Sequence, residues 1–180
     1  RVKDARPEAL FVFLPPGNQT IAFIKAYEER GLKQVGIRVI ATGDLTDDGV
    51  LSSMGDGTIG LTTSFHYSAA HESPENSAFL KAYVDTNGTK LRPNFMACAG
   101  YDGMAAIAEA LKKTQGSVDP VKLLAAFKGM KLMSPRGPIM IDPETRDIVQ
   151  TVYIRTVRKV NGELYNFEFE KFPDVRDPGK

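Results

Sequence analysis

The stretch Ala9-Leu-Phe-Val-Phe-Leu14 is apolar at every position. A short, continuously apolar run of this kind is typical of a strand that lies inside a parallel sheet and is covered on both faces. The turn-forming residues Pro15–Gly17 end the run, and a helical pattern then extends from Gln19 to Arg30 and stops at Gly31. This order predicts a buried strand followed by a helix.

Two further apolar segments, Gly36–Ala41 and Ile59–Phe65, have the same character and are separated by a polar turn. Strands that alternate with helices at this spacing indicate an open α/β sheet. Because right-handed crossovers connect such strands, we expect the three strands to be neighbours and to run parallel.

The middle of the sequence has a helical pattern. Caps and stops mark three helices, which we expect to begin at Ser73-Pro74, Asp102 and Asp119-Pro120 and to end near Gly88, Gly116 and Gly129. Each helix is apolar on one face only, yet the predicted strands already cover one another. We therefore expect the three helices to pack away from the first sheet, against sequence that this chain does not contain.

An antiparallel hairpin is expected near the C-terminal end. Ile148–Lys159 and Glu163–Lys171 flank Asn161-Gly162, a strong hairpin signal because a type I′ turn requires positive φ at both central residues. Pro138–Ile141 is a further local strand, and the polar tail Pro173–Lys180 indicates a frayed end. The predicted fold class is an open, parallel α/β sheet with flanking helices, closed by an antiparallel hairpin.

The charge balance argues against a polymeric partner. Lys and Arg number 23 and Asp and Glu 22, which gives the 180 residues a net charge of +1. Such a charge provides no long-range field to hold nucleic acid or an anionic membrane, so we expect no nucleic-acid partner.

Cys98 is the only cysteine, which excludes an internal disulfide. It lies among small and apolar residues, where a buried, unreactive thiol is expected rather than a nucleophile.

Two segments contain residue types that could bind a metal ion, but neither has suitable spacing. Asp44–Gly49 is similar to the first half of a calcium-binding loop, yet Gly55 stands where a bidentate Glu is needed. The set His66, His71 and Glu72 fits no helical two-histidine motif. No nucleophile elbow, dinucleotide-binding loop or phosphate loop occurs in the sequence. We therefore predict a binding protein without metal or cofactor, and not an enzyme.

The carboxyl ends of the three predicted strands bring three loops to one edge of the sheet, namely Pro15–Asn18, Gly43–Thr46 and His66–Ser68. Ligands of open α/β sheets bind outside this edge, toward which the N-termini of the following helices also point. Each loop alone could be an ordinary turn. Together the three loops predict a ligand site.

Four segments, Asp4–Phe13, Gly43–Thr46, Gly100–Met104 and Ser134–Ile139, occur in this order along most of the chain. As an ordered set they resemble the branched-chain amino acid group of periplasmic substrate-binding proteins of ABC transporters. In that family, which has the type I periplasmic-binding fold, two α/β lobes joined by three crossovers close on a ligand.

The resemblance implies a division of the chain between two lobes. Residues 1–67 and 142–180 match part of the C-terminal lobe, and residues 68–141 match a helical part of the N-terminal lobe. The chain is then a fragment of a larger protein, and the N-terminal half of that protein is a missing partner. This division would explain why the three helices lack a sheet.

The resemblance also implies a ligand site between the lobes. The family holds the ammonium group of an amino acid with an acid after the second strand, and Asp44 is the nearest match. In the amino acid binders this acid stands one place later, at Leu45, so amine recognition is left open. Phe95 matches an aromatic residue of the other lobe, and Tyr101 begins a helix, where packing within the lobe is the alternative role. The implied ligand-binding residues are Pro15, Pro16, Asp44, Leu45, Phe95 and Tyr101.

The function that the resemblance implies is capture of a small ligand outside the cytoplasm. The ligand is an amino acid or a related carboxylate, aromatic acids included, and the receiving partner is the permease of an ABC transporter. The location is periplasmic, or extracytoplasmic with a lipid anchor in a Gram-positive bacterium. The alternative is a ligand-sensing regulatory domain of the same fold, and neighbouring permease and ATPase genes would favour transport.

Overall fold

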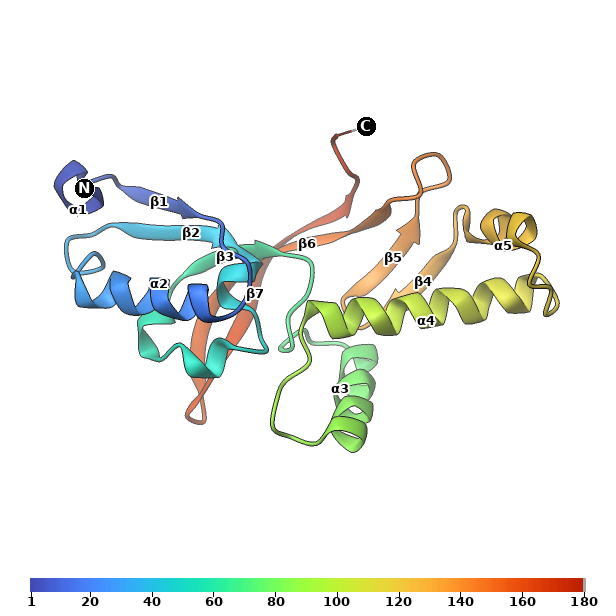
Figure 1. The fold of residues 1–180 in the computed structure, drawn as a ribbon, viewed down its shortest axis with the longest axis horizontal. Helices are drawn as coiled ribbons and strands as arrows, with labels where there is room; N and C mark the ends of the chain where they lie inside the picture. Colours follow the sequence, from blue (N-terminus) through green and yellow to red (C-terminus); the bar gives the residue numbers. More distant parts are fainter. Residues whose placement is uncertain (180) are drawn as a thin grey trace.

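The parallel part of the sheet contains β1 (Ala9–Val12), β2 (Arg38–Thr42) and β3 (Thr62–Phe65) in the computed structural model, which describes residues 1–179 (Figure 1). β1 pairs with β2 and β2 with β3, in both cases parallel. The prediction of three neighbouring parallel strands is therefore confirmed. Helix α2 (Asn18–Glu29) connects β1 to β2, as the sequence predicts.

The first hydrophobic core lies between this sheet and α2. Ile24 and Tyr27 of α2 are 0% and 3% exposed and belong to one cluster with Val39 and Ala41 of β2. The Tyr27 hydroxyl donates a hydrogen bond of 2.7 Å to the carbonyl of Ile37, so the buried phenol is satisfied. Three short 3₁₀ helices, η1 (Gly43–Thr46), η2 (Leu51–Ser53) and η3 (Asp56–Thr58), connect β2 to β3.

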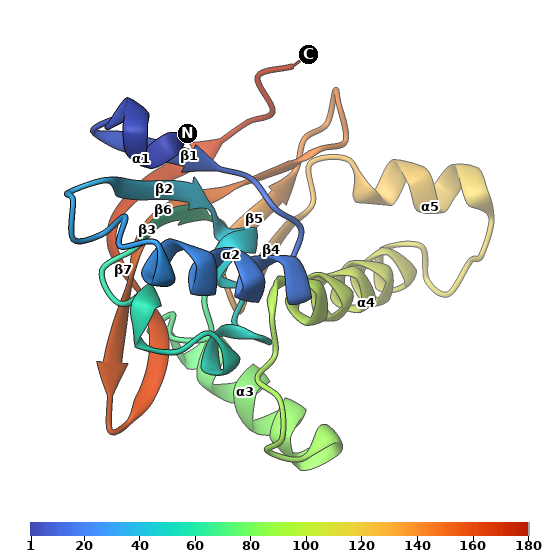
Figure 2. The same ribbon diagram turned by 60° about the vertical axis from the view of Figure 1, so that its left-hand side comes forward.

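The opposite face of the parallel strands is uncovered by residues 1–179. Phe11 of β1 is 69% exposed, Phe13 is 66% exposed and Ile40 of β2 is 46% exposed. The expectation that these strands are covered on both faces is therefore wrong for this chain, because α2 covers one face only (Figure 2). The apolar residues of both faces nevertheless made the strands easy to locate in the sequence.

A long antiparallel hairpin joins the two ends of the sheet. It contains β6 (Ile148–Val160) and β7 (Glu163–Val175). Asn161 and Gly162 have φ values of 52° and 85°, as the predicted turn requires. β7 continues to Val175, so the frayed tail begins later than the sequence suggested, and Lys180 lies outside the described residues. The charged segment before β1 forms a four-residue helix, α1 (Val2–Ala5).

β6 is the element that connects the parallel strands to the rest of the sheet. Its residues 153–156 pair with β3, and its residues 148–150 pair with β5 (Gly137–Ile141), in both cases antiparallel. β5 also pairs with β4 (Lys131–Ser134), which completes the sheet order β1-β2-β3-β6-β5-β4, with β7 beside β6. β5 was expected as a local strand; β4 is too short and too mixed in polarity to be predicted.

Three helices occupy the middle of the chain, as predicted: α3 (Pro74–Asn87), α4 (Phe95–Lys113) and α5 (Pro120–Phe127). The side chains of Ser73 and Asp119 cap α3 and α5. The expected cap of the second helix is wrong, because α4 begins at Phe95 and Asn94 caps it by accepting from the N–H groups of Met96 and Ala97.

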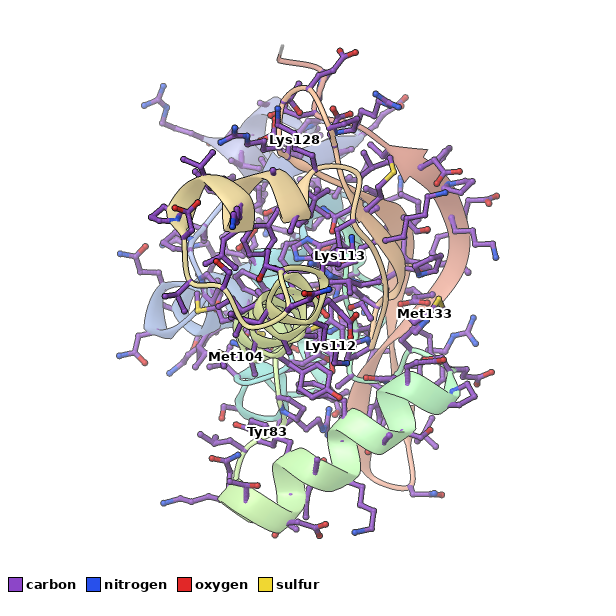
Figure 3. All side chains as sticks on the ribbon, turned by 90° about the vertical axis from the view of Figure 1, so that its right-hand side faces the viewer. Tyr83, Met104, Lys112, Lys113, Lys128 and Met133 are labelled. Carbon is purple, nitrogen blue, oxygen red and sulfur yellow. The ribbon has the colours of Figure 1, made fainter. Side chains whose placement is uncertain are left out.

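The helices pack away from β1–β3, and this prediction is confirmed. Figure 1 places α4 and α5 beside the β4–β5 hairpin, in the opposite half of the molecule from β1 and α2. Ala106 and Ala110 of α4 form a separate core there with Met130. The outer face of α4 stays uncovered, since Met104 is 66% and Ile107 is 44% exposed. In Figure 3, Met104 on α4 and Met133 on β4 point to opposite sides of the molecule.

None of the helices within residues 1–179 combines the length and the apolar character that a membrane crossing requires.

Candidate ligand-binding site

The loop after β2 presents a carboxylate whose charge acts on the buried Arg155. Asp44 lies in the first turn of η1, directly beyond the carboxyl end of β2, and its side chain is half-buried. It forms no hydrogen bond or ion pair with the residues that the structure describes. In the loop after β1, Pro15 is exposed and Pro16 is half-buried. Asp44 is therefore available to a ligand at the predicted sheet edge.

Arg155 of β6 connects the loops after β2 and β3. The residue is 1% exposed, and its Nη2 donates to the Gly43 carbonyl at 3.3 Å while Nη1 donates to the Tyr67 carbonyl at 2.5 Å. Its Nε also donates to Thr63 Oγ1 at 3.3 Å. One buried guanidinium thus fixes the positions of two backbone segments that border the candidate site.

Gly43 is required where these loops meet. A Cβ at this position would overlap the ring of Phe65 and the guanidinium of Arg155. Gly43→Ala should lower the free energy of unfolding by about 1–3 kcal/mol, because a rigid ring and a fully engaged cation would have to move. Thermal and urea unfolding measure this effect.

Gly57→Ala is the matched control for Gly43→Ala. A Cβ at Gly57 would meet only the end of the exposed, flexible Glu28 side chain. That side chain can rotate away, so the cost should stay below about 1 kcal/mol. Equal losses of stability in the two variants would contradict the close packing inferred at Gly43.

Three aromatic rings meet where the end of β3 faces the start of α4. The ring centroids of Phe65 and Phe95 are 4.9 Å apart with an interplanar angle of 78°. His66 lies 4.4 Å from Phe65 and 5.8 Å from Phe95. Edge-to-face contacts of this kind add to the stability of buried rings. The structure therefore brings Phe95 to the same edge as the loop after β3.

Burial and charge keep His66 neutral. The first cause is burial, which lowers its pKa from 6.5 to about 4, and the positive charges of Arg136 and Arg155 act in the same direction. A cationic imidazole would have to give up water and lie near two guanidinium groups. At neutral pH the ring is therefore an uncharged donor and acceptor.

The other acids of this loop are structural. Asp47 and Asp48 follow the second strand in the polar turn, yet they are 4% and 5% exposed. Asp47 accepts from Gly49 N–H and the Asn94 amide, and Asp48 accepts from Ala69 N–H and the Asn166 amide. Burial raises the pKa of both carboxyls. Partners distant in sequence, Asn94 for Asp47 and Asn166 for Asp48, enclose the two side chains.

The histidines do not form a metal site with neighbouring acids within residues 1–179. His71 Nδ1 lies 2.7 Å from Glu168 Oε2 on β7, and Glu72 is exposed. The His71–Glu168 pair fixes the segment that leads from β3 to α3 against the β6–β7 hairpin. His66 and His71 therefore have different surroundings, because His71 lies against an acid and His66 lies near two cations, Arg136 and Arg155.

A buried ion pair joins α4 to the β4–β5 hairpin. Asp102 Oδ2 accepts from Arg136 Nε at 2.9 Å and from Ser134 Oγ at 2.9 Å. Cys98, one turn earlier on α4, is 0% exposed, and burial is the main cause that raises its pKa to about 11. The expectation of a buried, unreactive thiol agrees with this position.

The structure separates two of the expected site residues from the others. Leu45 is 0% exposed and packs in the first core, so its side chain faces no ligand in this conformation. Tyr101 lies within α4, one and a half turns beyond its start, and packs 5.1 Å from the ring of Phe79. The expectation that Tyr101 begins a helix is therefore wrong. Sequence reasoning placed His66 in one of the three loops of the predicted ligand site and weighed it as a metal candidate, but it did not name His66 among the ligand-binding residues and gave no role to Arg155.

A cavity of about 780 Å³ lies between α1 and α2, among residues such as Val2, Phe23 and Tyr27. It is distant from the candidate residues and opens beside a terminal helix. The candidate site at the sheet edge is bordered instead by the loops after β2 and β3 and by the first turn of α4.

Comparison with known proteins gives a consistent result. A family model described as periplasmic binding protein matches residues 1–162. A curated relative from Brucella melitensis, Leu/Ile/Val-binding protein homolog 6, is 42% identical over 180 residues, which are 99% of this chain and 46% of the relative. The chain thus spans about half the length of the curated relatives it matches.

Solved structures extend the comparison. An ABC transporter solute-binding protein from Rhodopseudomonas palustris BisB5, in complex with 3,4-dihydroxybenzoic acid, is 57% identical with a TM-score of 0.93. The match covers 99% of this chain and 48% of that protein. A second solute-binding protein, from Rhodopseudomonas palustris HaA2 in complex with p-hydroxybenzoic acid, is 43% identical with a TM-score of 0.91. This match covers 99% of this chain and 48% of that protein.

Proposed function

The chain belongs to the periplasmic binding protein family, and we propose that it is the C-terminal part of an extracytoplasmic receptor for an ABC transporter. The receptor captures a small carboxylate between two lobes and delivers it to the permease. The observation that carries this proposal is the ring contact that Phe65 and His66, at the end of β3, make with Phe95 of α4. This contact lies beside the Asp44 loop, at the edge where open α/β sheets bind ligands.

The N-terminal half of the receptor is the partner that we propose for the uncovered apolar surfaces. Residues 1–67 and 142–180 then belong to the C-terminal lobe, and residues 68–141 to the N-terminal lobe. The exposed sides of Phe11 and Ile40 on the sheet, and of Met104 and Ile107 on α4, support this proposal. Apolar patches of this kind normally lie in an interface.

An aromatic acid is the ligand class that we propose first. Two relatives, at 57% and 43% identity, were solved with hydroxylated benzoic acids, and aromatic rings line the site in this chain. An amino acid is the second candidate. It is supported by the carboxylate of Asp44, which could pair with an ammonium group, and by the Brucella relative.

The receptor's action is binding without turnover in this proposal. It requires no metal or cofactor. It takes place in the periplasm or, in a Gram-positive bacterium, outside the cytoplasm on a receptor with a lipid anchor. A sensor domain of the same fold remains the competing role. Loss of uptake of the ligand in cells that lack the neighbouring permease gene would favour transport over sensing.

The ligand class is tested by thermal shift and calorimetry on the full-length receptor and its Asp44→Ala variant. We expect 4-hydroxybenzoate to stabilise the receptor by mass action and leucine to leave it unchanged. Asp44→Ala should then weaken 4-hydroxybenzoate binding by less than about tenfold. For an amine ligand, the same change should cost about 2–5 kcal/mol, because it leaves a buried ammonium unpaired.

Asp85→Ala is the control, since Asp85 is 60% exposed on α3 and pairs only with Lys81. If leucine stabilises the receptor instead, and Asp44→Ala abolishes this effect while Asp85→Ala preserves it, the ligand class is amino acids and not aromatic acids. Absence of binding to either class would contradict the receptor proposal.

A further inference from the structure

His66 has two polar atoms that the described chain leaves unused. Neither imidazole nitrogen has a hydrogen-bond partner within residues 1–179, and the ring is in contact with Phe65 and Phe95. The other histidine differs, because His71 Nδ1 is engaged with Glu168 at 2.7 Å. A half-buried imidazole that loses water without gaining a partner is costly. The free nitrogens of His66 are therefore available for a ligand.

The position of His66 places these nitrogens in the proposed cleft. The residue follows β3 directly, at the carboxyl edge of the parallel strands, and Phe95 opposite is the first residue of α4. A ligand that packs beside Phe95 therefore lies next to the imidazole. In the proposed receptor, closure of the lobes would remove the remaining water from this ring.

The charges around His66 favour an uncharged ring. Arg136 and Arg155 both act on it, and both are engaged with protein acceptors, Arg136 with Asp102 and Arg155 with backbone carbonyls. Burial and these charges lower the pKa of His66 to about 4. In either tautomer, the neutral ring offers one donor and one acceptor.

We propose that His66 recognises a ring hydroxyl of an aromatic acid and thereby sets the receptor's preference for hydroxybenzoates over benzoate. This assignment rests on the proposed function and deepens it. A hydroxyl group can both donate and accept, so it matches either free nitrogen of a neutral imidazole. A carboxylate can only accept, and its negative charge would find no cationic partner in this ring.

The hydroxyl in question is shared by the ligands of two relatives. Both 3,4-dihydroxybenzoic acid and p-hydroxybenzoic acid carry a hydroxyl opposite the carboxylate. An analogue without this group would leave the His66 nitrogens desolvated and unpaired. Sites built to hydrogen-bond a hydroxyl reject the analogue that lacks it for this reason.

The test compares 4-hydroxybenzoate with benzoate in the full-length receptor by calorimetry. The wild type should bind 4-hydroxybenzoate about 10- to 100-fold more tightly than benzoate. His66→Phe keeps the aromatic packing and removes both nitrogens, so this ratio should fall to about threefold or less, mainly through weaker 4-hydroxybenzoate binding. His66→Asn keeps a donor and an acceptor and should retain part of the preference.

His71→Phe is the matched control and should leave the ratio of affinities unchanged. A ratio in His66→Phe equal to that of the wild type would overturn the assignment while the proposed function stands. If neither acid binds to the wild type, both the assignment of His66 and the aromatic acid as the ligand class are overturned. If the variants fold poorly, NMR of the histidine-labelled wild-type receptor tests the same role. 4-Hydroxybenzoate should shift the His66 ring resonances more than benzoate does. Equal shifts would overturn the role of His66.

Discussion

Replacement of Arg155 by Met should lower the free energy of unfolding of the protein by about 3–5 kcal/mol, because it breaks a buried network of charges and hydrogen bonds. Asp48 is 5% exposed, and Arg155 is the main charge that counteracts the desolvation of its carboxylate. The carbonyls of Gly43 and Tyr67 would lose a donor at the same time. Urea unfolding followed by circular dichroism measures the loss.

Arg158→Met is the control for this prediction. Arg158 lies three residues further along β6, is exposed, and places its guanidinium 5.4 Å from the ring centroid of Phe167. Its replacement should change the stability by less than about 0.5 kcal/mol. Similar losses in both variants would show that Arg155 does not hold the loops of the site together.

The parallel strands and the hairpin were predictable because local sequence determines them. The apolar run from Ala9 to Leu14 breaks at two prolines, and Asn161-Gly162 permits positive φ at both turn positions. The start of α4 was not predictable in the same way. Asn94 and Asp102 are both capping residues by type, and only the buried partner Arg136 assigns Asp102 to the interior of the helix.

The candidate site was only partly predictable, since its supports are distant in sequence. Asp48 lies in a segment that the sequence marks only as a polar turn, but it accepts a hydrogen bond from Asn166, which is 118 residues away. One signal for Arg155 was present in β6, where alternate residues lie on the buried face, namely Val149, Thr151, Tyr153 and Val157. Arg155 shares that parity, and a cation among buried residues of a strand indicates a buried network.

Asp102→Ala should destabilise the region of α4 and the β4–β5 hairpin by about 3–5 kcal/mol, because it leaves the guanidinium of Arg136 buried without its partner. The two side chains are 9% and 8% exposed and 2.9 Å apart. Ser134 Oγ would also lose its acceptor. The measurement is urea unfolding, with hydrogen exchange of the α4 amides to locate the effect.

A double replacement separates the cost of the unpaired charge from the value of the pair. Asp102→Leu combined with Arg136→Met removes both charges, and it should recover most of the stability that Asp102→Ala loses, because apolar residues of similar volume replace buried ion pairs without a large penalty. Asp56→Ala, which breaks the exposed pair with Lys159, should cost less than about 1 kcal/mol. If Asp102→Ala costs no more than Asp56→Ala, Arg136 has found water or another acceptor, and the pair does not join α4 to the hairpin. If the double variant is as unstable as Asp102→Ala, the loss arises from packing and from Ser134 and not from the unpaired guanidinium.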